Sequence, residues 1–308
     1  MNTIEQAAKR LEQLRRSGVD VQPEALGESN TTSLTSAPQA LAPVPPPAAA
    51  APAPEAPQAA AAGHEERRSR EVTVDLLRMQ RAGLLVPGQP RSQLEEEFRI
   101  VKRPLLENVR GQGAMRPDRA NLIMITSAVP GEGKTQTAIN LAVSIAMELD
   151  HTVLLVEADV LRPSALERLG VQASKGLLDL LESPSTQLPD VLLRTNIPKL
   201  TLLPAGTASS RSTELLASDA MGRLLAELAS KYADRVIIFD TPPLLSTTES
   251  RVLASHMGQV VMVVEANATP ITTIKQAFAT VESHPVVLSM LNKYQGPKGS
   301  TAYGYYAP

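Results

Sequence analysis

Short apolar runs alternate with segments of helical periodicity from residue 121 onward, and this alternation predicts the fold of most of the chain. Apolar runs of strand length occur at residues 121–126, 152–157, 200–204, 236–240, 260–265 and 286–291. Between them, apolar residues recur at i, i+3 and i+4, as they do over residues 135–148. Strands that are apolar on both faces are typical of parallel sheets covered on both sides. We therefore expect an α/β fold with a mostly parallel sheet and helices on both faces.

The N-terminal part has a different composition. Residues 1–27 contain one amphipathic segment, which is either a solvated or packed helix or a docking helix for a partner chain. Its apolar residues follow a and d spacing: Ile4, Ala7, Leu11 and Leu14. Residues 28–63 consist mainly of Ala, Pro, Ser and Thr. They offer too little bulky apolar surface to offset ordering entropy, so we predict a disordered, extended linker.

Residues 64–293 are the predicted folded domain, and a helix is expected near its start. Ser92 and Glu95 form a capping-box pattern, and Pro104 predicts that the helix ends near residue 103. Three charged residues recur at three-residue spacing along it: Glu96, Arg99 and Lys102. Periodicity alone favours a solvated helix face for these three residues.

Composition excludes several classes of protein. The 308 residues include 30 Lys and Arg against 32 Asp and Glu, so no net field favours nucleic acid. The chain has no Cys, which excludes disulfides and thiolate metal sites. No apolar run has the length of a membrane span, and the N-terminus lacks a signal-like apolar region. We expect a cytoplasmic protein whose membrane role, if any, comes through a partner.

The segment between the first predicted strand and its helix has the pattern of a phosphate-binding P-loop (Walker A). It reads Ser-Ala-Val-Pro-Gly-Glu-Gly-Lys-Thr over residues 127–135. The two glycines allow backbone N–H groups to turn toward an anion at the N-terminus of the helix. Lys134 is expected to reach the β- and γ-phosphates of ATP, and Thr135 to bind Mg²⁺. The predicted nucleotide-binding residues of the loop are Pro130, Gly131, Glu132, Gly133, Lys134, Thr135 and Gln136.

Acidic residues end two of the other predicted strands. Asp240 occupies a Walker B position, where a carboxylate binds Mg²⁺ directly or through water. Glu157 and Asp159 are two residues apart and would share a face, toward the metal and the attacking group. The alternative for each carboxylate is a cap on the following helix. Arg162 would contact phosphate or pair with Asp159. The predicted metal ligands are Thr135, Asp159 and Asp240.

Tyrosines are concentrated at the C-terminus. Of five tyrosines, four lie in the last fifteen residues: Tyr294, Tyr303, Tyr305 and Tyr306. We interpret them as phosphate acceptors on a flexible tail, residues 294–308; a surface-packing tail and a base-stacking platform are the alternatives. Asn292, which ends the last predicted strand, is either an adenine contact or a turn residue.

Together these motifs resemble one family. The P-loop, the strand end Val-Leu-Leu-Val-Glu-Ala-Asp-Val-Leu-Arg-Pro, the Ile-Ile-Phe-Asp-Thr-Pro-Pro motif and the tyrosine cluster resemble the bacterial protein-tyrosine autokinases, or BY-kinases. The resemblance covers about residues 90–308. The N-terminal helix, the linker and the stretch Phe-Arg-Ile-Val-Lys-Arg-Pro are similar to the soluble subgroup found with exosortase-associated exopolysaccharide loci.

The resemblance implies a function and an assembly. Glu157 and Asp159 correspond to the Walker A′ motif, and Glu96, Arg99 and Lys102 to a Glu-x-x-Arg-x-x-Arg helix that joins subunits into a ring, with Lys in the last place. It further implies autophosphorylation with ATP and Mg²⁺, a membrane-bound polysaccharide chain-length partner and no nucleic-acid partner. The expected class is therefore a non-specific protein-tyrosine kinase that regulates exopolysaccharide biosynthesis or export.

Two residues depart from the family pattern. Glu157 stands where the family usually has Asp, which moves the carboxylate by on the order of 1 Å, enough to slow phosphotransfer. Leu161 stands where members often have Arg. Val129 occupies the position of the early P-loop Lys of MinD/ParA-type ATPases, which argues against that group. The remaining alternatives are an ATPase switch that does not phosphorylate tyrosine and a nucleotide-gated adaptor that binds through its tyrosine tail.

Overall fold

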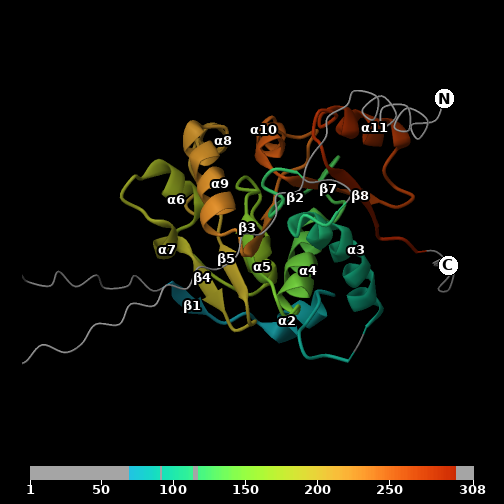
Figure 1. The fold of residues 1–308 in the computed structure, drawn as a ribbon, viewed down its shortest axis with the longest axis horizontal. Coiled ribbons are helices and arrows are strands. Elements are labelled where there is room, and N and C mark those ends of the chain that lie inside the picture. Colours follow the sequence, from blue (N-terminus) through green and yellow to red (C-terminus); the bar gives the residue numbers. More distant parts are fainter. Residues whose placement is uncertain (1–68, 91, 114–116, 296–308) are drawn as a thin grey trace, which may run out of the picture. The chain divides into compact units, whose positions relative to one another are not determined.

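A computed structural model describes residues 69–90, 92–113 and 117–295 (Figure 1). The predictions for the N-terminal helix, for the Ala/Pro linker and for Tyr303, Tyr305 and Tyr306 lie outside the described residues. Within the part that is described, no helix is both long enough and apolar enough to cross a bilayer.

One eight-stranded sheet organises the described domain. Its strands are β1 (Arg70–Val72), β2 (Leu122–Ser127), β3 (Thr152–Glu157), β4 (Leu193–Thr195), β5 (Leu200–Leu203), β6 (Arg235–Asp240), β7 (Gln259–Glu265) and β8 (Val287–Asn292). Their spatial order is β1-β4-β5-β3-β6-β2-β7-β8, and every neighbouring pair is parallel except β4 and β5. The expectation of a mostly parallel sheet is confirmed.

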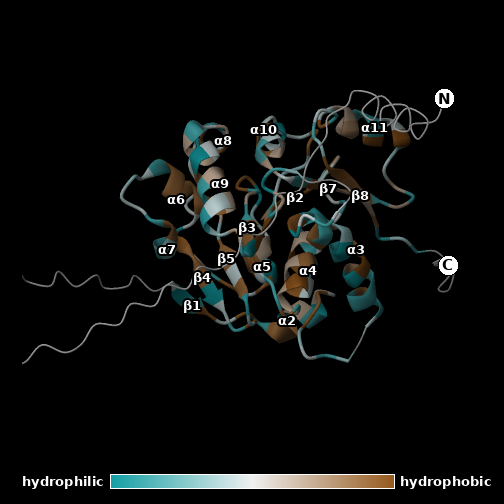
Figure 2. Ribbon diagram, viewed as in Figure 1, coloured by the Kyte–Doolittle hydropathy of each residue, from teal (hydrophilic) through white to brown (hydrophobic). Residues whose placement is uncertain are grey.

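Alternate residues of the central strands face two separate cores, which is why these strands are apolar throughout. In β2, Leu122 and Met124 belong to one core, and Ile123 and Ile125 to the other. The strands β3, β6 and β7 alternate in the same way. Figure 2 shows the apolar strands and α4 in brown, whereas much of α3 is teal. Because both faces are buried, helices must cover both of them.

The helices divide between these two faces. Residues of α2 (Leu76–Arg81), α3 (Gln93–Val109), α4 (Lys134–Ala146) and α5 (Ala165–Arg168) contribute to the core that contains Ile123. The opposite core contains residues of α6 (Leu177–Glu182), α7 (Leu188–Val191), α8 (Ser212–Leu216), α9 (Asp219–Lys231), α10 (Glu249–His256) and α11 (Ile271–Ala279). Both faces of the sheet are therefore covered, as predicted.

The hydrophobic pattern predicts six of the strands but not β1 and β4. Each of these two has three residues and only Leu193 in β4 is buried, so neither presents an apolar run. They lie at one edge of the sheet, where β4 is antiparallel to β5.

The prediction that the helix after Ser92 ends near Pro104 is wrong. The helix α3 begins where the capping pattern places it, with the Ser92 hydroxyl accepting from the Glu95 N–H at 3.1 Å, but it continues to Val109. Proline removes one helical hydrogen bond, at a cost of about 3 kcal/mol. Leu105 and Leu106 are buried in the core directly after it. Burial of these two side chains offsets that cost.

The predicted charged stripe on this helix is also corrected. Arg99 pairs with Glu96 at 2.9 Å on the partly exposed face. Lys102 instead points inward: only 6% of the residue is exposed, and its Nζ donates to the Ser144 carbonyl at 2.7 Å and to Glu148 at 2.6 Å. Six residues at 100° per residue place Lys102 about 120° around the helix from Glu96. Lys102 therefore ties α3 to the end of α4 within the domain.

Candidate active site

The P-loop connects the carboxyl end of β2 to the N-terminus of α4. Gly131 and Gly133 have φ of 94° and 99°, in the left-handed region that favours glycine. Gly133 is the N-cap of α4, and no side chain in residues 69–90, 92–113 or 117–295 caps this helix. Its first N–H groups are therefore available to bind an anion, as the sequence predicts.

Glu132 and Asn292 hold the loop in this shape. The Glu132 side chain is buried and accepts hydrogen bonds from the Val129 N–H at 2.8 Å, the Thr269 hydroxyl at 2.5 Å and the Glu265 N–H at 3.3 Å. Asn292 donates from Nδ2 to the Glu132 carbonyl at 2.8 Å. Both predicted nucleotide-binding side chains are thus engaged with the protein, and they position the loop.

Lys134 and Asp159 form an ion pair at the centre of the site. Nζ of Lys134 lies 2.6 Å from Oδ2 of Asp159, and both side chains are largely buried. The other oxygen of Asp159 accepts the backbone N–H of Arg162 at 3.2 Å. The structure thus joins the P-loop lysine to the second carboxylate of the predicted strand-end pair, while Arg162 contacts Asp159 through its backbone.

Asp240 is fully buried, and among the described residues neither of its carboxylate oxygens has a hydrogen-bond partner. Burial raises its pKa to about 7, although the positive charge of Lys134 and the hydroxyl of Thr135 act in the opposite direction. The nearby Asp159 and Glu157 carboxylates contribute to this increase in the pKa.

An unpartnered buried carboxylate beside a threonine hydroxyl suits Mg²⁺. Magnesium is typically held by one or two carboxylates together with waters and substrate phosphates. Asp240 and Thr135 supply such oxygen ligands next to the phosphate loop. The described residues contain no cluster of three or more acidic or His side chains suited to a metal, so an all-protein cage is not present in them. The available ligands therefore fit a magnesium ion that is shared with nucleotide phosphates.

The prediction that Glu157 faces the metal position is wrong. Its Oε1 accepts from the N–H groups of Ala165 at 2.7 Å and Leu166 at 3.3 Å, and its Oε2 from Ala205 at 3.4 Å. Burial raises its pKa, while these backbone N–H groups lower it. Glu157 thus takes the alternative of the two roles considered for it, a cap at the N-terminus of α5, and only Asp159 of the pair enters the cavity.

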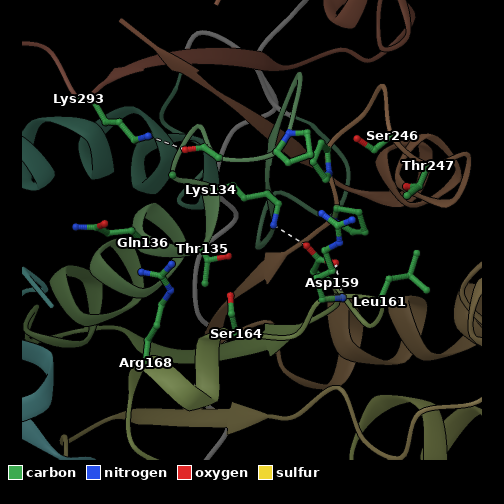
Figure 3. A pocket seen from close by; sticks show the side chains of 16 residues that line it. Lys134, Thr135, Gln136, Asp159, Leu161, Ser164, Arg168, Ser246, Thr247 and Lys293 are labelled. Carbon is green, nitrogen blue, oxygen red and sulfur yellow. Dashed lines mark hydrogen bonds and ion pairs between the residues drawn. The ribbon is translucent and has the colours of Figure 1, made fainter. Parts of the chain in front are cut away.

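The P-loop and the segments that follow β3, β6 and β8 line a cavity of about 620 Å³ (Figure 3). The predicted residues that it brings together are Pro130, Gly131, Gly133, Lys134, Thr135, Gln136, Asp159 and Arg162. Its other lining residues are Leu161, Ser164, Arg168, Pro242, Pro243, Ser246, Thr247 and Lys293. Of these, the two prolines lie two and three residues after Asp240, and Lys293 follows Asn292, so proximity in sequence could have indicated them. Arg168 carries no such signal.

Comparisons with known proteins agree with this geometry. Residues 120–288 match the AAA domain family. The chain is 31% identical over 232 residues to the tyrosine-protein kinase YwqD of Bacillus subtilis, covering 74% of this chain and 92% of YwqD. It is 30% identical to the succinoglycan biosynthesis transport protein ExoP of Rhizobium meliloti over 72% of this chain, but spans only 27% of ExoP. Likewise, it is 27% identical to the tyrosine-protein kinase wzc of Salmonella typhimurium over 74% of this chain, but spans only 31% of wzc.

A solved structure agrees as well. The crystal structure of the chimerical protein CapA2B2 has a TM-score of 0.58 and 26% identity, covering 72% of this chain and 93% of the other. The family match extends over more than half of the chain and includes the P-loop, Asp159 and Asp240. On this evidence the chain belongs to the bacterial tyrosine-protein kinases, built on a P-loop AAA domain.

Proposed function

We propose that this protein is an autokinase that uses ATP and Mg²⁺ to phosphorylate its own C-terminal tyrosines between the subunits of an oligomer. The observation that carries the proposal is the convergence of three groups on one cavity. Two of these groups line the cavity, the Lys134–Asp159 pair and the Thr135 hydroxyl. The third is the unpartnered carboxylate of Asp240, which is buried behind the cavity and interacts with Thr135.

Each residue of the site has a role in this reaction. Lys134 and the first N–H groups of α4 would bind the ATP phosphates, and Thr135 with Asp240 would hold the metal. Mg²⁺, when bound, neutralises charge on the β- and γ-phosphates. Asp159 would orient the acceptor hydroxyl and take its proton. The phenol oxygen bonds to the γ-phosphorus, the bond to the β–γ bridging oxygen breaks, and ADP leaves.

The proposed acceptors follow the last strand. Tyr294 is exposed, and Tyr303, Tyr305 and Tyr306 are close to it in sequence. An extended segment from Lys293 to Tyr306 would span at most about 45 Å, enough to enter the cavity of a neighbouring subunit. Each phosphate adds roughly −1.5 to −2 charge to a tail that has no acidic residue. Repulsion from Asp159 and Asp240 would then release the modified tail, which makes the reaction self-limiting.

The assembly and the pathway are part of the same proposal. Glu96 and Arg99 lie on the partly exposed face of α3 and remain proposed subunit contacts, whereas the buried Lys102 would act only through the position of that helix. The transport role in the name of ExoP supports a place in exopolysaccharide synthesis or export. A membrane-bound chain-length protein would recruit this kinase to the inner face of the cell membrane.

Intact-mass measurement after incubation with Mg-ATP tests the proposal. The autokinase gains phosphate on tail tyrosines, an ATPase switch produces ADP without added mass, and an adaptor does neither. Lys134→Met is the control, since it removes a phosphate contact. Phosphate incorporation at the wild-type rate in that variant would contradict the assignment of the site.

A further inference from the structure

The active-site cavity has two chemically different ends (Figure 3). On one side of Lys134 lie polar and cationic side chains: Gln136, Arg168 and Lys293. Lys293 is paired with Glu265 at 2.9 Å, and Gln136 donates to the Gly83 carbonyl at 3.3 Å. On the other side lie one apolar and two hydroxyl side chains: Leu161, Ser246 and Thr247. The buried prolines Pro242 and Pro243 also line the cavity. The catalytic roles described above use neither Leu161 nor these prolines.

Leu161 is an unusual residue for this position. It is 54% exposed, although it lies only two residues from Asp159 and lines a cavity rich in charge. Covering an exposed apolar side chain with a ligand removes apolar surface from water, which favours binding of that ligand.

The prolines that line the same cavity are fixed by hydrogen bonds of their own segment. The Pro242 carbonyl accepts from the Thr126 hydroxyl at 2.9 Å and from the Ser250 hydroxyl at 3.0 Å. Leu244, directly after the prolines, donates its N–H to the Ser127 carbonyl at 2.8 Å. This segment is therefore fixed relative to the P-loop strand, as a preformed binding surface requires.

The direction of phosphoryl transfer decides which ligand each end receives. The attacking and leaving oxygens lie roughly in line on opposite sides of the transferred phosphorus. Nucleotide phosphates on Lys134 and the start of α4 place the sugar toward Gln136, Arg168 and Lys293, where polar and cationic groups gather. The acceptor must then enter from the opposite end, past Leu161.

We propose that Leu161, together with Pro242 and Pro243 of the same cavity, forms the acceptor subsite and contacts the ring of a tail tyrosine from a second copy of this chain. The inference rests on the proposed function and adds how that reaction selects its acceptor. An apolar ring fits beside Leu161 while its hydroxyl reaches Asp159. Serine and threonine offer no ring to this surface. The tail provides tyrosines among Gly, Ser and Pro, without an acidic residue that Asp159 and Asp240 would repel.

Transfer between chains tests the subsite. The enzyme is the full-length chain with its four tail tyrosines changed to Ser, and the acceptor is the full-length Lys134→Met chain at varied concentration. We expect Leu161→Asn to raise the half-saturating acceptor concentration about tenfold, and Leu161→Met to restore it, with the half-saturating ATP concentration unchanged. Leu149→Asn is the matched control, since Leu149 is 89% exposed after the opposite end of α4.

Direct binding separates failure of the subsite from failure of the function. A fluorescein-labelled peptide with the sequence of residues 294–308 is titrated with the same enzymes in Mg-ADP, and its anisotropy is followed. Weaker peptide binding by Leu161→Asn than by Leu149→Asn supports the subsite, even if no tyrosine is phosphorylated. Absence of phosphorylation would refute only the proposed autokinase activity. Equal peptide affinity and equal acceptor dependence in the two variants overturn the subsite, whatever the kinase activity.

Discussion

Replacing Asp240 with Asn should stabilise the protein when metal and nucleotide are absent, although the same change should nearly eliminate phosphotransfer. Asp240 is fully buried, and neither of its oxygens has a hydrogen-bond partner within the described part of the chain, so the folded state holds its charged form at a cost. Asn keeps the shape and removes the charge.

The pKa gives the magnitude and the sign. Burial raises the pKa of Asp240 from 3.8 to about 7, a difference of about 3 pH units. At about 1.36 kcal/mol per unit, the charged carboxylate costs about 4 kcal/mol above pH 7. The cost decreases as the pH falls through 7, because the folded state then binds a proton that the unfolded state does not, and it disappears below pH 3.8. At pH 4.5 about 1 kcal/mol remains.

We therefore expect Asp240→Asn to raise the free energy of unfolding by about 1–3 kcal/mol at pH 8, since the buried amide retains part of the desolvation cost. At pH 4.5 the charged carboxylate costs the wild type about 3 kcal/mol less, so the difference should fall to about 0 to −2 kcal/mol. Urea unfolding in EDTA, followed by far-UV circular dichroism because the chain has no Trp, measures it. Mg-ATP should stabilise the wild type but not the variant, because the variant lacks the metal ligand.

Asp179→Asn is the matched control with the opposite sign. Burial raises the pKa of Asp179, but hydrogen bonds from Thr207 and Gly176 outweigh this effect and lower the pKa below its ordinary value. Removing that charge should destabilise the protein at pH 8. If Asp240→Asn destabilises the metal-free protein as Asp179→Asn does, then the Asp240 carboxylate is satisfied in the folded state, and the assignment of an open magnesium ligand is refuted.

Further predictions concern the other charged residues. Lys102→Met should lower the free energy of unfolding by about 1–3 kcal/mol, because it leaves Glu148 and the Ser144 carbonyl without their buried partner; an unchanged urea midpoint would contradict the internal role of Lys102. In initial-rate assays, Glu157→Gln should keep the rate of tail phosphorylation within about threefold of the wild type, whereas Asp159→Asn should lower it by about 100-fold or more. Equal losses in the two variants would indicate that Glu157 is the catalytic base. In a mixture of Lys134→Met chains with tagged chains whose four tail tyrosines are Phe, phosphate should appear on the former; labelling only of the wild type, at a concentration-independent rate, would show transfer within one chain.

The sequence alone determined the features that depend on local order along the chain. The strands that the pattern predicts are continuous apolar runs because both faces of the sheet are buried. Since parallel strands end at one edge, the P-loop, Asp159 and Asp240 could be assigned to one site before any contact was known. The capping pattern also correctly predicted that α3 starts after Ser92, because a helix cap involves only residues within one turn of each other.

The tertiary structure decided where side chains point and which elements survive against local propensity. Burial of Leu105 and Leu106 carries α3 through Pro104, and helix rotation turns Lys102 inward to Ser144. The Glu157 carboxylate accepts hydrogen bonds from the N–H groups at the start of α5. These groups lie beside the end of β3 only because of the tertiary fold. Arg168 reaches the cavity by the same packing. The directions of these side chains and the length of α3 depend on contacts with residues distant in sequence, which a local sequence pattern does not contain.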